Sequence, residues 1–189
     1  MTAGLPQSHH DYTFADYLAL ERDSEIKHEF DGGEILAMSG GTSRHSALAL
    51  KIGTALETTR PRGCTVFQSD MRVRIAATGR ATYPDVSMVC GPIEYDPDDA
   101  ERTTIRNPVL LVEVLSVTTE KGDRGNKWMH YQRIPSLQEY VLANHDPRIE
   151  IFRRTPSNTW EYFEASEGRV QLACGPTLDL AMLYADLPL

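Results

Sequence analysis

The segment Val109–Leu115 is an apolar run that contains one charged residue, Glu113. Because the run does not alternate apolar with polar residues, it predicts a β-strand that is buried on both faces. An unpaired charge in such a strand would cost roughly several kcal/mol. Two kinds of partner would offset this cost: a bound cation, or a salt bridge to a buried arginine or lysine. The fold must bring one of them to the centre of a sheet.

A second carboxylate, Asp85, stands at the start of the apolar segment 85–89 and follows Pro84. Proline has no N–H and suits the first position of a strand. A single aspartate there is also typical of a turn or a cap. Together with Glu113, however, it predicts two carboxylates on neighbouring central strands, to which the Val114 carbonyl adds an oxygen. Magnesium prefers such ligands, and a metal held in this way activates water, so the pattern indicates a hydrolytic metal site.

A lysine, Lys127, lies in the helix that the pattern predicts over residues 123–133. One interpretation is an i,i+4 pair with Asp123, worth only about 0.2–0.5 kcal/mol. The other is a cation that reaches the scissile phosphate or orients the attacking water. Tyr131 lies one turn further on the same face, where packing is the favoured interpretation.

The order of elements predicts an α/β (α+β) fold with a mixed central sheet. The strand 109–115, the helix 123–133 and the strand 139–143 form a βαβ unit, which implies a parallel strand pair with a right-handed crossover. The length of 189 residues fits one domain, 1–189, with its core at about 13–153. The remaining expected elements are a helix over 13–21, a hairpin over 26–38, a helix over 43–59, and strands at 64–68, 71–75, 85–89, 148–153, 159–165 and 170–173. Residues 76–81 read as a turn and 91–107 as a long polar loop.

The formal net charge of −8 argues against indiscriminate binding of nucleic acid. Between Arg44 and Arg80, however, basic residues outnumber acidic ones by seven to two. This region is either an ordinary solvated surface or a side that faces phosphates. Arg72 and Arg74 share one face of the strand 71–75, where they would contact a nucleic-acid backbone. The seven basic residues are Arg44, Lys51, Arg60, Arg62, Arg72, Arg74 and Arg80.

The cysteines and the hydropathy predict a cytoplasmic protein with no membrane span. Cys64, Cys90 and Cys174 are odd in number and lack paired spacing, which is typical of reduced packing residues. No stretch of about 18 apolar residues is present. The segment Met1–Tyr12 has neither a basic nor an apolar region of a secretory signal.

Several stretches resemble the Uma-two (Uma2) family of restriction endonucleases, within the PD-(D/E)xK restriction-endonuclease-like superfamily. They extend from Thr13 to about Phe152, and their joint order is more specific than any single stretch. The similar stretches are Lys27–Ile35, Ser43–Ser46, Tyr83–Ser87, Leu111–Ser116, Asp123–Lys127 with Tyr131, and Glu139–Leu142.

The resemblance implies a restriction-endonuclease-like core with an N-terminal β-hairpin and a β-rich C-terminal extension. It implies an endonuclease that uses Mg²⁺, with Mn²⁺ as a substitute, to hydrolyse phosphodiester bonds in DNA as a homodimer. The catalytic residues would be Asp85, Glu113 and Lys127. The lysine of the family pattern would stand at position 115, where this chain has Leu115, and Lys127 from the adjacent helix is its stand-in.

Two further residues, Glu29 and His45, fall on positions typical of the family. Glu29 would be a further acidic ligand or a group that supports the ligands, and His45 either a structural residue or a proton carrier. The alternative function is a non-catalytic module that binds nucleic acid or protein, which Leu115 and the net negative charge favour. A glycoside hydrolase is disfavoured, because both carboxylates lie in apolar strands with few aromatic residues to stack on sugars.

Overall fold

The computed structural model describes residues 11–116 and 122–188. Within these ranges, no helix combines the length and hydrophobicity needed to cross a membrane. The helices are α1 (Phe14–Asp23), α2 (Ser43–Thr59), the π-helical segment η1 (Gly122–Lys127), α3 (Trp128–Tyr131) and α4 (Leu180–Tyr184). The strands are β1 (His28–Asp31), β2 (Glu34–Ala37), β3 (Cys64–Gln68), β4 (Arg72–Ile75), β5 (Arg80–Thr82), β6 (Val86–Cys90), β7 (Thr104–Ile105), β8 (Leu110–Val114), β9 (Glu139–Ala143), β10 (Ile149–Arg154), β11 (Trp160–Ala165), β12 (Arg169–Gln171) and β13 (Thr177–Asp179).

The strands form two main sheets and a small hairpin. The first sheet has the order β2-β1-β5-β4-β7, the second has the order β11-β10-β9-β8-β6-β3, and β12 pairs with β13. Strands β8 and β9 run parallel, as the βαβ pattern predicts, whereas β8 and β6 run antiparallel. The prediction of a mixed central sheet is therefore confirmed.

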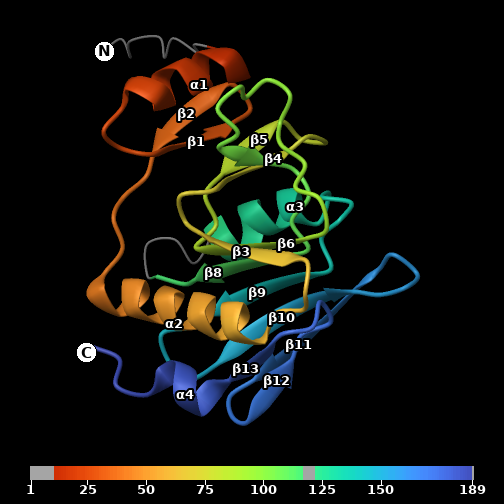
Figure 1. Cartoon of the computed structure of the whole chain (residues 1–189). Coiled ribbons are helices and arrows are strands. Elements are labelled where there is room, and N and C mark those ends of the chain that lie inside the picture. The colour runs from red at the N-terminus through yellow and green to blue at the C-terminus, as the bar shows by residue number, and fades with distance from the viewer. Residues whose placement is uncertain (1–10, 117–121, 189) are drawn as a thin grey trace, which may run out of the picture.

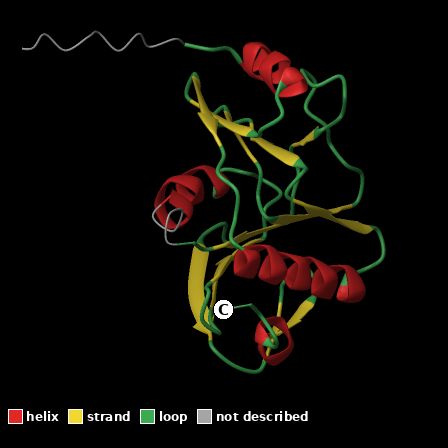
Figure 2. Cartoon of the chain, turned by 90° about the vertical axis from the view of Figure 1, so that its left-hand side faces the viewer, coloured by secondary structure: helices red, strands yellow, loops and turns green. Residues whose placement is uncertain are grey.

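Helices cover both faces of the second sheet (Figures 1 and 2). Leu48, Ile52 and Leu56 of α2 pack with Leu110 and the other β8 side chains of one face. The opposite face packs against α3 and against β4 of the first sheet, through a buried cluster that contains Leu111, Tyr131, Val73 and Ile75. The alternation of β8 side chains therefore decides which layer each one meets, and Glu113 faces the α3 layer.

The N-terminal elements follow from local signals in the sequence. Thr13 caps α1 by accepting a hydrogen bond from the Asp16 N–H, and Asp16 reciprocates in a capping box. The hairpin β1–β2 turns at Gly32 and Gly33, whose φ angles of 58° and 91° lie in the left-handed region that favours glycine. The helix, the hairpin and α2 are thus confirmed.

Other elements depend on contacts that are distant in the sequence. The predicted turn 76–81 overlaps β5, which is held between β1 and β4. The predicted loop 91–107 contains the two-residue strand β7, which pairs in parallel with β4. The predicted helix 123–133 begins as a π-helix, and β13 and α4 were not predicted. Strands of two or three residues have too little periodicity to be seen in a sequence.

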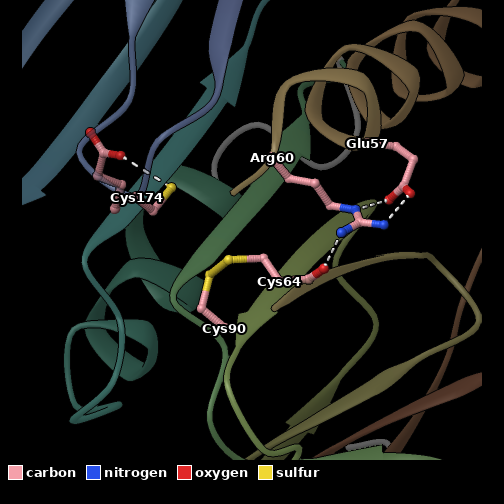
Figure 3. Close-up of a disulfide and its surroundings, with 6 residues drawn as sticks. Glu57, Arg60, Cys64, Cys90 and Cys174 are labelled. Atoms are coloured by element: carbon pink, nitrogen blue, oxygen red, sulfur yellow. Dashed lines mark hydrogen bonds and ion pairs between the residues drawn. A yellow bond between two sulfur atoms is a disulfide. The ribbon is translucent and has the colours of Figure 1, made fainter. Parts of the chain in front are cut away.

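The prediction that the cysteines are reduced is wrong for Cys64 and Cys90. These residues are directly opposite each other on the adjacent strands β3 and β6, and they form a disulfide (Figure 3). Only a strand pairing brings them together, since 26 residues separate them. Cys174 is the free cysteine; it is buried, and its burial beside Glu139 raises the pKa of its thiol to about 12. Because disulfides are rare in reducing compartments, the cysteines no longer support a cytoplasmic location, which stays a prediction.

The disulfide predicts a specific thiol count. Unreduced protein unfolded in guanidinium should react with one equivalent of a thiol reagent, at Cys174, and reduced protein with three. The double variant Cys64→Ser/Cys90→Ser should lose up to about 3 kcal/mol of unfolding free energy, because the open loop regains entropy when unfolded. Three reactive thiols before reduction would contradict the bond.

Candidate active site

Asp85 and Glu113 lie beside each other on neighbouring strands. Val86 of β6 pairs with Val112 of β8, and continuing this antiparallel register by one residue sets Asp85 opposite Glu113. The Asp85 Oδ2 atom accepts a hydrogen bond from the Val114 N–H at 2.7 Å. The register thus brings the backbone of Asp85 close to Glu113 and Val114 at one end of β6.

Glu113 has protein partners in the helix that follows its strand. Its side chain is 4% exposed, and its Oε1 atom lies 3.0 Å from Lys127 Nζ. The same oxygen accepts a hydrogen bond of 2.8 Å from the Tyr131 hydroxyl. Burial raises the pKa of Tyr131, so this hydroxyl keeps its proton and remains a donor. The salt-bridge interpretation of Glu113 matches these contacts, and the metal site stays a prediction.

The helix geometry explains why both partners come from one segment. Lys127 ends η1 and Tyr131 ends α3, and residues four apart lie on the same face of a helix. Trp128, one residue on, points elsewhere and stacks on Phe152 with ring centroids 4.3 Å apart. The pairing of Lys127 with Asp123 concerns a side chain outside the described part of the chain.

Glu29 reaches the site from the first sheet. Its carboxylate lies 3.6 Å from Lys127 Nζ and 2.9 Å from an Arg80 guanidinium nitrogen, and it accepts a hydrogen bond from the Thr82 hydroxyl. Burial acts to raise the pKa of Glu29, but Lys127, Thr82 and Arg80 outweigh it, so the pKa is lowered. Lys127 therefore connects a carboxylate of each sheet. Sequence reasoning missed Arg80 and Thr82, which lie on the short strand β5.

His45 lies on the other side of Asp85. Its Nε2 atom is 3.1 Å from Asp85 Oδ2, and its backbone N–H is bonded by the helix cap Thr42. A Cβ added to Gly41 would come within 2.7 Å of the His45 Nδ1 atom. Glycine at position 41 therefore leaves the space that the imidazole occupies. Contacts with His45 and with the Val114 N–H hold the orientation of the Asp85 carboxylate.

A cleft of about 960 Å³ borders this end of the site. One wall is formed by α2 and the opposite wall by β3, and Asp85 and His45 lie along it. Its remaining lining is mostly uncharged; Lys27 and Glu57 are the other charged residues that line it in the described chain. The cleft gives Asp85 a route to the surface.

The Arg72 side chain is buried in a network inside the protein. Its side chain is 6% exposed and donates hydrogen bonds to Tyr83 and Thr104. The guanidinium of Arg74 stacks on the Phe14 ring, 3.7 Å from its centroid, and bonds the Gly79 carbonyl. A contact between Arg72 and a nucleic-acid backbone would require this buried network to open.

The basic region as a whole is largely occupied by internal contacts. Six of its seven basic residues bond acceptors of the protein: Arg44, Lys51, Arg60, Arg72, Arg74 and Arg80. Two of these, Arg44 and Lys51, hold carbonyls near the C-terminus, at Pro188 and Ala185. The phosphate-facing interpretation of this region therefore gains no support from its charge count.

The predicted donors suit a hard divalent cation, but the protein would supply only a few of its ligands. Within residues 11–116 and 122–188, no group of three or more His, Cys, Asp and Glu side chains converges as a metal site. Magnesium, however, is often bound by one or two carboxylates, with water and substrate phosphates completing the shell. Asp85, Glu113 and the Val114 carbonyl match that kind of site, although Lys127 already contacts Glu113.

The sequence profile of the Uma2 family, described as "Putative restriction endonuclease", matches residues 14–184. The chain belongs to the Uma2 family. The uncharacterized protein slr1290 of Synechocystis sp. (strain ATCC 27184 / PCC 6803 / Kazusa) is 33% identical over 177 residues, which are 91% of this chain and 90% of that protein. A second protein of the same strain, sll1609, is 32% identical over 150 residues, which are 78% of this chain and 84% of that protein.

A solved structure has the same fold as this Uma2 chain. It is a crystal structure from Anabaena variabilis ATCC 29413, described as "a putative nuclease belonging to DUF820". The TM-score is 0.73 with 18% sequence identity, and the match covers 93% of this chain and 99% of that one. At this identity the likeness establishes the fold, which confirms the expectation of a nuclease-like architecture.

Removing the lysine should destabilise the protein more than removing an exposed one. Lys127→Met leaves two buried carboxylates without their shared cation, so we expect a loss of about 3 kcal/mol in the free energy of unfolding. The matched control is Lys27→Met, which breaks an exposed pair with Asp70 and should cost less than about 1 kcal/mol. Equal losses in urea denaturation would argue against the pairing of Lys127 with Glu113.

The lowered pKa of Glu29 predicts a pH effect with a defined sign. A depressed pKa in the folded state stabilises the protein above the unfolded pKa and is lost as the pH falls through the folded value. Wild-type protein should therefore lose stability below about pH 4.5, the usual value for glutamate. In Glu29→Gln this part of the loss should be absent. Unfolding measured from pH 7 to pH 3 tests this, and parallel curves for the two proteins would refute it.

Proposed function

We propose that this chain is a metal-dependent endonuclease that hydrolyses phosphodiester bonds in DNA. What supports the proposal is the strand register, which extrapolates to Asp85 opposite Glu113, together with the Lys127 ammonium 3.0 Å from the glutamate. Two carboxylates can hold a metal ion that activates water, and a lysine can stabilise the charge that develops on a phosphodiester during hydrolysis. Membership of the Uma2 family supports the same reaction class.

In this proposal Asp85, Glu113 and the Val114 carbonyl hold Mg²⁺, for which Mn²⁺ can substitute. The bound ion would supply charge neutralisation at the phosphate and activation of water. The carboxylates are oriented by the protein itself: Asp85 by the Val114 N–H and His45, and Glu113 by the Tyr131 hydroxyl. Such prior orientation reduces the reorganisation that the reaction needs.

Lys127 is the proposed electrostatic catalyst. Its ammonium lies 3.0 Å from Glu113 and 3.6 Å from Glu29, and a cation at this position can stabilise negative charge that develops on a phosphate. A phosphate oxygen or the attacking water is the acceptor that we assign to it during the reaction. Glu29, paired with Arg80, supports Lys127 in this role by holding it from the first sheet.

The cleft between α2 and β3 is the proposed path of the DNA strand toward Asp85. Because the neighbouring basic residues are held by internal acceptors, few phosphates would be neutralised. We therefore expect weak binding with a shallow dependence on salt. A homodimer, as the family resemblance suggests, would supply a second site for the opposite strand.

The decisive experiment is plasmid nicking by purified protein with Mg²⁺ or Mn²⁺. Asp85→Asn and Glu113→Gln should each lower the rate by about 100-fold or more, because each removes a charge at the reacting centre. The matched controls are Asp70→Asn and Glu101→Gln, exposed acids outside the lining of the cleft, which should leave the rate within about twofold, as expected for surface changes. Rates unaffected by Asp85→Asn would refute the assignment.

The alternative is a binding module without turnover. The contact between Lys127 and Glu113 favours it, because an internal cation already satisfies the buried carboxylate. In that case wild-type protein would bind DNA without cutting it under any metal condition. Binding measured by fluorescence anisotropy alongside nicking separates the two functions.

A further inference from the structure

Arg124, which neither function uses directly, makes a two-pronged ion pair with a buried carboxylate. Its Nη2 atom lies 2.7 Å from Glu150 Oε1, and its Nη1 atom bonds Glu150 Oε2. Glu150, on β10, is 3% exposed. Burial acts to raise the pKa of Glu150, but Arg124 and Asn144 outweigh it and the pKa is lowered, so the carboxylate is charged. Bidentate pairs of this kind fix direction as well as distance.

The partner of Arg124 is itself held firmly. The Asn144 side-chain amide donates to Glu150 Oε1 at 3.1 Å and to the Arg148 carbonyl at 3.2 Å. The Tyr184 hydroxyl, from α4, donates to the Asn144 carbonyl at 2.8 Å. Glu150 is therefore a fixed point of the second sheet and of the C-terminal elements.

The helix that Arg124 belongs to needs such a fixed point. η1 has six residues in π-helical geometry and α3 has four more, and helices this short are marginal without tertiary contacts. At its other end the segment is held by the stacking of Trp128 on Phe152. Arg124 is three residues before Lys127, on the turn that leads into the site.

We propose that Arg124 is a positioning residue, which holds η1 against Glu150 so that the Lys127 ammonium stays beside Glu113. The link runs from a fixed carboxylate on β10, through one guanidinium and one helical turn, to the lysine. The role of Arg124 in placing the helix can be tested whether or not the protein is an enzyme. The effect on turnover rests on the proposed nuclease function, and a small displacement of a catalytic group costs up to about 100-fold in rate.

The position of the helix can be measured without an enzyme assay. The chain has two tryptophans, so in a Trp160→Phe background Trp128 alone reports on α3. Adding Arg124→Met should raise acrylamide quenching of Trp128 by about twofold, because local opening exposes the ring. Adding Arg60→Met, which breaks a bidentate pair with Glu57 on α2, should leave quenching unchanged. Unchanged quenching in Arg124→Met would overturn the proposal.

A second variant and the kinetics complete the test. Glu150→Gln breaks the same pair from the opposite side and should raise quenching in the same way, even where Arg124→Met does not fold. Arg124→Lys, which keeps the charge but not the fork, should give intermediate quenching.

In nicking assays kcat should fall about 10–100-fold in Arg124→Met, with KM for DNA and the affinity for Mn²⁺ unchanged. A raised KM with unchanged kcat would mean that Arg124 contacts DNA and would overturn the positioning role. If wild-type protein does not cut DNA, the proposed function fails, and the quenching results still decide whether Arg124 holds the helix.

Discussion

The burial of Glu113 is the constraint on which the arrangement of this protein depends. A carboxylate inside a strand that is covered on both faces is tolerated only with close partners, and here they are Lys127 and Tyr131. Both come from the short crossover helix between β8 and β9. The helix must therefore lie over β8 in a single position and orientation. Because the helix is short, contacts with other elements are needed to fix it there. The stacking of Trp128 and the ion pair of Arg124 provide them.

The same charges join the two sheets. Lys127 contacts Glu113 of the second sheet and Glu29 of the first, and Arg80 binds Glu29 and Asp31. Buried charges in such a chain add little net stability compared with apolar packing, yet losing one member leaves another unpaired. Their value is geometric, since they fix the sheets relative to each other at the place where Asp85 meets the cleft. The candidate site is thus part of the interface that holds the fold together.

Individual residues show which features of the structure could be predicted from the sequence. The strand β8, the parallel partner β9 and the hairpin at Gly32 could be predicted, because periodicity and turn chemistry are local signals. The proximity of Asp85 and Glu113 could be expected from two adjacent central strands. The partners of Glu29 could not, because β5 is too short to show a pattern. The Cys64–Cys90 bond and the burial of Arg72 also escaped, since both are set by strand pairing and by a network of Tyr83, Thr104 and Glu21. The number of basic residues in a segment describes its composition and does not show whether their side chains are exposed.

Among the strands of the described residues, β3 is an outer strand of its sheet next to β6, and it forms one side of the cleft. The disulfide of Cys64 links one end of β3 covalently to β6. At the opposite end, Gln68 pairs with Val86 through the backbone. When one end of a strand is covalently linked, local opening begins at the other end. The Gln68 end adjoins Asp85 and the cleft, so in the proposed function the part of β3 that opens most easily is the part nearest the path assigned to the DNA.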